Sequence, residues 1–306
     1  MKAKQAPKRF SPPEGTISVL LLNPNSSRPM TEAMARLVIP KLKHATMSII
    51  LETYTAPSGP KSINNDQDIK ASTDVVLEDE RLMRLLHGPD AKYDYVIVAC
   101  FSVHPLVSVL GGMLSIPVIG IFEASVDLAS GIWSRTARAM FSEDADCPTT
   151  TTSAGHLEEG MNSPQQQGDQ PQGPERWAII TTGEFWEEHL STGVERLGKD
   201  DDSFVGVFST GLTAADFHTG EEIDQERIKK DEEIKRKVRE AMRRLLQCQG
   251  VRYVIMGCGG MGSLRTFISD TAVELTSSKI QVIDPVVAAM SQVHDFEARG
   301  EKSYPQ

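Results

Sequence analysis

Two cysteines occupy matching places in the two halves of this sequence. Cys100 follows the apolar run YVIVA at 95–99, and Cys258 follows the similar run YVIMG at 253–257. A residue directly after a buried strand lies at the carboxyl edge of its sheet, where open α/β sheets bind ligands. Two thiols on opposite sides of a carbon acid can invert it, because one removes a proton and the other returns a proton to the opposite face. Most free cysteines are small core residues, but the repeated position favours an acid/base pair.

The stretch GCGGMGSL at 257–264 also matches G-x-G-x-x-G, the pattern of a dinucleotide-binding turn, and Asp284 stands where a ribose-binding acid is expected. A dinucleotide fold needs several further strands, however, and only one short apolar run follows. The two halves share the strand and the cysteine, not the glycines. We therefore interpret the stretch as a turn that presents Cys258 and lowers its pKa through backbone N–H groups. Gly259 and Gly260 would let the backbone approach a substrate, and a nucleotide-binding module is the alternative.

The elements that must position these thiols alternate between apolar strands and helices. The predicted strands are Ile17–Leu22, Met47–Tyr54, Tyr95–Ala99, Pro117–Phe122, Ala178–Thr181, Phe204–Phe208, Tyr253–Met256 and Gln281–Ile283. The predicted helices begin near Met30 and Val286 and span Ser72–Leu86, Pro105–Leu114, Ala124–Ser130, Glu222–Gln247 and Leu264–Leu275. This alternation predicts an α/β fold with mainly parallel sheets and right-handed crossovers.

Composition limits the classes of protein that fit. The chain has 306 residues, 40% of them hydrophobic, which suits two domains. Its formal net charge of −10 disfavours binding to nucleic acid and to anionic membranes. Its four cysteines are widely spaced without a C-x-x-C pair, so we expect reduced thiols, a cytoplasmic protein and no metal site.

Three segments differ from the alternating pattern or could be mistaken for a membrane span or a signal peptide. Residues 95–122 carry no Lys, Arg, Asp or Glu, but prolines and glycines interrupt them, so we expect buried elements and not a membrane span. Residues 1–15 are basic without the apolar core of a signal peptide and are predicted to be a flexible tail. Residues 142–175 are rich in Pro, Gln, Thr and Gly, which predicts a disordered insertion.

Four motifs together resemble the aspartate/glutamate/hydantoin racemase superfamily, and most closely its hydantoin and allantoin racemase branch with its fungal relatives. They are ISVLLLNPNSS at 17–27, ACFSVHPL around Cys100, PVIGIFEA at 117–124 and GCGGM around Cys258. The resemblance implies two pseudosymmetric α/β lobes, a small-molecule site in the cleft between them and no cofactor, and it leaves a homo-oligomer open. It places residues 16–115 and 280–306 in the first lobe and 116–279 in the second, with the strands at 117–122 and 281–283 crossing between lobes.

The same resemblance assigns roles to residues at the predicted carboxyl edge. Cys100 and Cys258 are the implied acid/base pair, and Asn23 and Asn25 are implied to line the pocket. Thr182 and Gly183 occupy the matching position in the second half, and the turns beside the two thiols add Ser102, Gly259 and Gly260 as predicted substrate-binding residues. The alternative for the two asparagines is an Asn-Pro-Asn turn that caps the next helix. His104 is better explained as a helix-start histidine than as a modulator of Cys100. Glu123 is favoured at a helix start by the helix dipole alone.

The three loops differ from those of relatives that act on free acidic amino acids. Such relatives have loops that resemble D-S-G, C-N-T and C-T-H, where this chain has N-P-N, C-F-S and C-G-G. The missing aspartate removes a partner for a substrate ammonium group, whereas amide and backbone donors suit a neutral cyclic ureide. We therefore expect a racemase of 5-substituted hydantoins or allantoin. The alternatives are an aspartate or glutamate racemase and a catalytically silent ureide-binding or nucleotide-binding protein.

Overall fold

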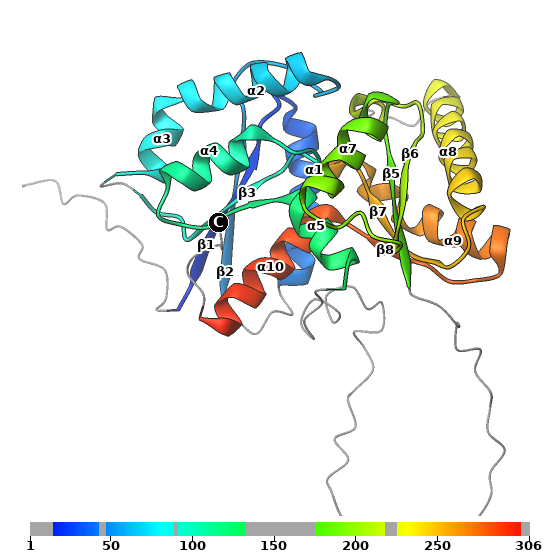
Figure 1. Ribbon diagram of the computed structural model, residues 1–306. Coiled ribbons are helices and arrows are strands. Elements are labelled where there is room, and N and C mark those ends of the chain that lie inside the picture. The colour runs from blue at the N-terminus through cyan, green and yellow to red at the C-terminus, as the bar shows by residue number, and fades with distance from the viewer. Residues whose placement is uncertain (1–14, 43–46, 89–90, 132–174, 218–224, 301–306) are drawn as a thin grey trace, which may run out of the picture.

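The computed structural model describes residues 15–42, 47–88, 91–131, 175–217 and 225–300 (Figure 1). They form two four-stranded parallel sheets that stand side by side with helices against their faces. The first sheet has the order β2-β1-β3-β4, with β1 Ile17–Asn23, β2 Ile49–Thr55, β3 Tyr95–Val98 and β4 Val118–Gly120. The second has the order β6-β5-β7-β8, with β5 Arg176–Thr181, β6 Phe204–Ser209, β7 Val251–Met256 and β8 Gln281–Ile283. The two strand orders are equivalent, so the predicted pair of similar α/β lobes is confirmed.

Helices follow the strands in both lobes. The first lobe contains α1 Arg28–Leu42, α2 Asp66–Glu78, α3 Glu80–Leu86 and α4 Pro105–Met113. The second contains α7 Phe185–Arg196, α8 Gln225–Leu246, α9 Arg265–Thr276 and the 3-10 turns η1 Ala214–Phe217 and η2 Gly259–Leu264. Two further helices, α5 Ile121–Ala129 and α10 Pro285–Arg299, follow the last strand of each sheet. Within the described ranges, every helix is too short or too polar to cross a membrane.

Both faces of the first sheet are buried at β1, β3 and β4, which explains the continuous apolar sequence of these strands. Leu20 and Leu22 point to one face and share a core with α2, α3 and α4. Val19 and Leu21 point to the opposite face and belong to a core that continues into the second lobe. One apolar core therefore extends from the first lobe into the second.

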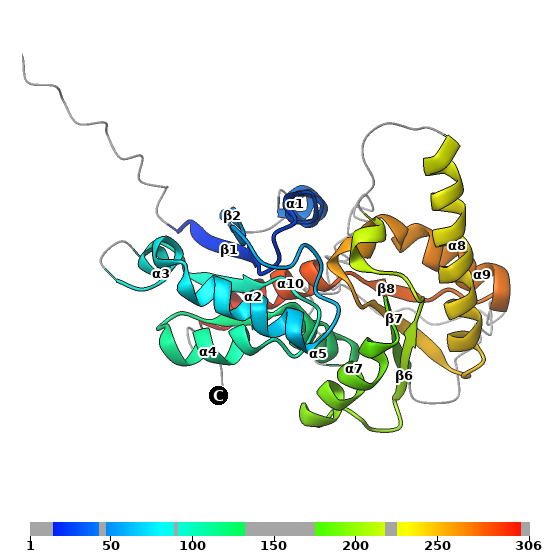
Figure 2. The same ribbon diagram turned by 90° about the horizontal axis from the view of Figure 1, so that it is seen from above.

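Helices, and not strands, connect the two lobes. β4 pairs with β3 and β8 pairs with β7, so the predicted crossing of these strands between lobes is wrong. The predicted lobe limits at 116 and 280 therefore place β4 and β8 in the wrong lobes. β4 belongs to the first sheet, and β8 belongs to the second. The crossing elements are α5 and α10, which pack against each other in the middle of the molecule (Figure 2). Tyr95 of β3 donates a hydrogen bond to Glu297 of α10 at 2.7 Å and holds this helix to the first sheet.

Several element boundaries differ from the sequence-based expectation. The helix predicted over 72–86 is two helices, because the Asp79 carboxylate accepts from the N–H groups of Arg81 and Leu82 and so starts α3. Ile121 and Phe122 open α5 and do not end a strand. Helix α7 was not predicted. Residues 1–14 of the predicted tail and 142–174 of the predicted insertion lie outside the described residues.

Candidate active site

Cys100 and Cys258 lie at equivalent places at the carboxyl edges of the two sheets. Each cysteine follows a central strand, β3 in the first lobe and β7 in the second. The residue before each cysteine donates its backbone N–H to the adjacent strand: Ala99 to Leu22 O at 2.8 Å, and Gly257 to Ile180 O at 2.7 Å. The parallel ladders therefore fix both thiols in the same way.

The two thiols have different neighbours. Cys100 is half-buried, and its Sγ lies 3.4 Å from the hydroxyl of Ser102, which is fully buried. Cys258 is buried and caps η2, where its Sγ accepts from the backbone N–H of Gly260 at 3.4 Å. A backbone N–H is only a donor and so favours the thiolate of Cys258, whereas a hydroxyl can serve either a thiol or a thiolate.

Burial raises the pKa of both thiols above the ordinary value of about 9. The pKa of Cys100 rises to about 12, chiefly through burial; the Ser102 hydrogen bond opposes this rise, and the charges of Cys258 and Glu123 add to it. The pKa of Cys258 rises to about 11 through burial, against backbone N–H groups of the following turn. The expected lowering of the Cys258 pKa is wrong, because desolvation of the thiolate outweighs these donors.

The charge of one thiol acts on the other, so the two thiols lie close enough to interact electrostatically. The charge of Cys258 raises the pKa of Cys100, so ionisation of one thiol disfavours ionisation of the second. The pair is thereby biased against a double thiolate. One thiolate beside one thiol is the state that proton removal on one face and proton delivery on the other require.

The asparagines that follow β1 are not equivalent. The Nδ2 of Asn23 donates to Asn25 Oδ1 at 3.0 Å, Ser27 O at 3.3 Å and Thr31 Oγ1 at 2.8 Å. Asn23 also accepts from the backbone N–H of Asn25 at 3.2 Å, so its amide is used within the turn. The Nδ2 of Asn25 contacts the sulfur of Met30 at 3.1 Å, which is a weak acceptor. The alternative of an Asn-Pro-Asn turn therefore accounts for Asn23. Of the two asparagines, Asn25 remains the better candidate to donate a hydrogen bond to a substrate.

Thr182 and Gly183 lie in the loop after β5, which is the counterpart of the asparagine loop. The backbone oxygen of Thr182 accepts from Thr210 at 2.9 Å, and the Thr181 hydroxyl donates to Gly257 O at 3.1 Å. These bonds tie the loop to β6 and to the residue before Cys258. The loop thus lies at the carboxyl edge, and its contact with substrate stays a prediction.

The glycines of the Cys258 turn allow the lobes to approach each other closely. A Cβ added to Gly259 would lie 2.5 Å from Met34 Sδ on α1, and one added to Gly262 would collide with Leu37 of the same helix. Packing against the first lobe therefore accounts for this spacing of glycines. Asp284 caps α10, where it accepts from two backbone N–H groups at 3.0 Å. Both features on which the nucleotide-binding alternative depended thus have structural explanations.

His104 is a buried neutral cap, as the simpler interpretation of its sequence position suggested. Its Nδ1 accepts from the backbone N–H of Leu106 at 3.3 Å, so its ring proton is on Nε2, which lies 3.1 Å from the Ser72 hydroxyl. Burial lowers the pKa of His104 to about 4, and nearby His189 contributes. A histidine in this state orders the loop after Cys100 and does not act as a base near neutral pH.

Glu123 is a functional candidate that our predicted site omitted. It lies in the first turn of α5, directly after β4, and its charge reaches Cys100. The residue as a whole is half-buried, yet its Oε2 is inaccessible to solvent and has no hydrogen-bond partner. Burial raises the pKa of Glu123 to about 7, with Asp127 adding to the rise and its own backbone N–H opposing it. The sequence signal was a glutamate just after an apolar strand, which the helix dipole also explains.

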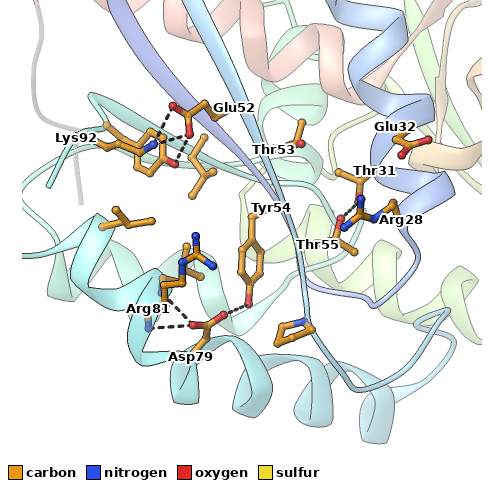
Figure 3. A pocket seen from close by; sticks show the side chains of 15 residues that line it. Arg28, Thr31, Glu32, Glu52, Thr53, Tyr54, Thr55, Asp79, Arg81 and Lys92 are labelled. Atoms are coloured by element: carbon orange, nitrogen blue, oxygen red, sulfur yellow. Dashed lines mark hydrogen bonds and ion pairs between the residues drawn. The ribbon is translucent and has the colours of Figure 1, made fainter. Parts of the chain in front are cut away.

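A pocket of about 570 Å³ lies away from the thiols, over the edge strand β2 of the first sheet (Figure 3). Its polar side chains largely pair with one another. Lys92 donates to Glu52 at 2.6 Å, and the Tyr54 hydroxyl donates to Asp79 at 3.0 Å. Neither cysteine and none of the predicted substrate-binding residues lines it. Chemistry therefore favours the thiol pair over this pocket.

In the described part of the chain, no group of three or more His, Cys, Asp or Glu is arranged to hold a metal ion. The chemistry that Cys100 and Cys258 themselves offer is removal of a proton by one sulfur and delivery of a proton by the other.

Comparison with known proteins adds a family and a fold. The sequence pattern of the family described as Asp/Glu/Hydantoin racemase matches residues 19–138 and 167–293, which include both cysteines. An uncharacterized protein of Schizosaccharomyces pombe is 25% identical over 276 residues, covering 90% of this chain and 89% of that protein. 

Solved structures with the same fold include an allantoin racemase from Klebsiella pneumoniae, with 20% identity, a TM-score of 0.62 and coverage of 94% of this chain and 90% of that chain. The allantoin racemase of Pseudomonas fluorescens has 18% identity, a TM-score of 0.62 and coverage of 94% of each chain. A glutamate racemase from Francisella tularensis is less similar, with 11% identity, a TM-score of 0.53 and coverage of 95% of this chain and 84% of that chain. These likenesses show a shared fold.

Proposed function

Because the chain belongs to the aspartate/glutamate/hydantoin racemase family, and is therefore an isomerase, we propose that it racemises a small cyclic ureide without a cofactor. The substrate class is a 5-substituted hydantoin or allantoin, and the inverted carbon lies next to a carbonyl. The observation that carries this proposal is the pair of thiols, Cys100 and Cys258, which follow equivalent strands of the two lobes and interact electrostatically.

Cys258 is the base of the resting enzyme in this proposal. Backbone N–H groups at its turn favour its thiolate. The thiolate removes the proton from the substrate carbon, and the electron pair of the C–H bond moves onto the carbonyl oxygen as an enolate. The thiol of Cys100 then gives its proton to the opposite face of the carbon. Turnover in this direction leaves Cys258 as the thiol and Cys100 as the thiolate, so the reverse reaction restores the starting state.

The loops support a neutral ring as the substrate. Asn25 offers an amide N–H for the developing enolate oxygen, since its Nδ2 otherwise contacts a thioether. The loop after β1 contains no carboxylate, because residues 23–27 read NPNSS. A substrate ammonium group therefore lacks the partner that relatives acting on acidic amino acids supply in this loop. The fold shared with two allantoin racemases is compatible with the same class of substrate.

Polarimetry and proton NMR in D₂O test the proposal directly. Purified protein is incubated with each enantiomer of several 5-substituted hydantoins, allantoin, aspartate and glutamate, without added metal or nucleotide and with a chelator present. We expect loss of optical rotation and deuterium exchange at the α carbon for at least one ureide. Exchange and inversion of aspartate or glutamate alone would replace the proposed substrate class. Binding of ureides without exchange would identify a catalytically silent protein, and recovery of activity only with a divalent ion would contradict the cofactor-independent mechanism.

A further inference from the structure

Glu123 lies in the first turn of α5, directly after β4, a strand that neither thiol follows. β3 and β4 are paired so that Val98 lies beside Gly120. Cys100 and Glu123 therefore emerge from neighbouring strands at the same carboxyl edge. The carboxylate folds back over its own strand end, because its Oε2 occupies the place that a Cβ on Gly120 would need. A glycine at 120 thus makes room for the Glu123 carboxylate.

The environment of the Glu123 Oε2 atom is energetically unfavourable if the residue has only a structural role. It is buried without a hydrogen-bond partner, and a buried acceptor in this state loses its hydration without compensation. The cap position of α5 is Gly120, which has no side chain, and the backbone N–H of Glu123 that lowers the pKa of its carboxyl group leaves Oε2 without a partner. Asp127, one turn further along α5, raises the cost of the charge and does not neutralise it. A donor from outside the chain would satisfy this oxygen.

We propose that Oε2 of Glu123 accepts a hydrogen bond from a ring N–H of the substrate, which makes Glu123 a specificity-determining residue of the ureide site. This inference rests on the proposed racemisation of a cyclic ureide. In a 5-substituted hydantoin, the inverted carbon is bonded to the ring nitrogen N1. When the Cys100 thiol lies against that carbon, a hydrogen-bond acceptor close to Cys100 is therefore also close to N1–H. The division of roles is complementary, because Asn25 offers a donor for a carbonyl oxygen and Glu123 offers an acceptor for an N–H.

A variant series with paired substrates tests this role. Racemisation of a 5-substituted hydantoin and of its N1-methyl derivative is measured for the wild type, Glu123→Met and Glu123→Gln. The methionine variant keeps the volume of the side chain and removes the acceptor, whereas the glutamine variant keeps a weaker, uncharged acceptor. The wild type should prefer the N–H substrate by about 10- to 100-fold in kcat/KM, the range for one hydrogen bond to a charged group. Glu123→Met should lose most of this preference, and Glu123→Gln should retain part of it.

Two control variants separate recognition from folding. Asp127→Asn neutralises a carboxylate on the same helix and should keep the wild-type preference. Gly120→Ala retains Glu123 but displaces its carboxylate, so it should lose the preference as Glu123→Met does, and it carries the test if Glu123→Met fails to fold. Racemisation with an unchanged preference in both Glu123→Met and Gly120→Ala would overturn this inference alone. Failure of the wild type to racemise any ureide would overturn the proposed function, and this inference with it.

Discussion

The loop after β3 and the loop after β7 present a thiol at the same position but are held by different means. Side chains order the first loop: the Ser102 hydroxyl contacts Cys100, and His104 caps α4. The backbone orders the second: the Gly260 N–H donates to Cys258, and the absence of a side chain at Gly259 allows contact with α1. The hydrogen bonds between parallel strands thus set the positions of the thiols, and the two loops can differ in sequence and in hydrogen bonding.

This difference gives the two thiols different hydrogen-bond partners. Backbone donors remain donors at every pH, so they stabilise the thiolate of Cys258. The first loop offers a hydroxyl that can reverse its hydrogen bond, and Glu123, at the start of α5, opposes ionisation of Cys100. Two lobes with equivalent strand orders can therefore supply one base and one acid. The following predictions test the shared position first, then each loop, and finally a segment outside both.

Replacing either thiol should have the largest effect. Cys100→Ser and Cys258→Ser should each reduce inversion by at least about 10³-fold, because a hydroxyl is a much weaker acid and base catalyst than the thiol pair. Each variant should still exchange the α proton of one enantiomer with D₂O through the remaining cysteine, and the two variants should prefer opposite enantiomers. NMR of separate enantiomers measures this. Equal exchange of both enantiomers by one variant would show that a single residue does the work.

Acidification should weaken the loop after β3 through His104. Its folded pKa of about 4 is below the ordinary value of 6.5, so the unfolded chain binds the proton first as the pH falls. The stability that depends on neutral His104 is complete above pH 6.5 and is lost as the pH falls from 6.5 through 4, to a total of about 3 kcal/mol. His104→Asn keeps a capping acceptor and should lose less stability than the wild type between pH 7 and pH 4.5 in urea unfolding. Identical losses in both proteins would assign the pH dependence to other groups.

Crowding the loop after β7 should destabilise the interface between the lobes. The added methyl group of Gly259→Ala meets Met34, which is fully buried, and should lower the free energy of unfolding by about 1–3 kcal/mol. Met34→Ala makes room, so the double variant should be more stable than the sum of the two single changes predicts. Gly111→Ala is the control, because its methyl group would meet no atom within 4 Å. Additive effects of the Gly259 and Met34 changes would contradict the contact.

The smallest effect should come from the segment between the two lobes. β5 begins at Arg176, so the chain enters the second sheet at its amino edge, opposite Cys258. Replacement of residues 142–174 by a short Gly/Ser linker should change kcat/KM by less than about tenfold, or 1.4 kcal/mol. Glu175 is retained, because it accepts a hydrogen bond from Tyr253 at 2.7 Å. A larger loss of activity would mean that this segment reaches the site.

Patterns of residues that are close together in the sequence were sufficient to predict most of the fold. Apolar runs predicted the eight strands, and their alternation with helices predicted parallel sheets. Helix α7 was missed although Trp186, Leu190 and Val194 follow one another at four-residue spacing and are buried. The crossing of β4 and β8 between lobes was inferred from the family resemblance and is wrong. Hydrophobicity could not correct it, because it indicates that both strands are buried but not which strand each one joins.

The sequence by itself determined the two cysteines, their places after matching strands, the family motifs and the acidic surface. Only the tertiary structure decided that Asn23 is used within its turn, that Gly259 makes room for Met34, and that the Glu123 carboxylate lies near Cys100. It also decided that burial raises the pKa of both thiols and does not lower it. The physical reason is that strand and helix patterns follow from residues a few positions apart. Desolvation, electrostatic coupling and unpaired acceptors depend on residues that only folding brings together.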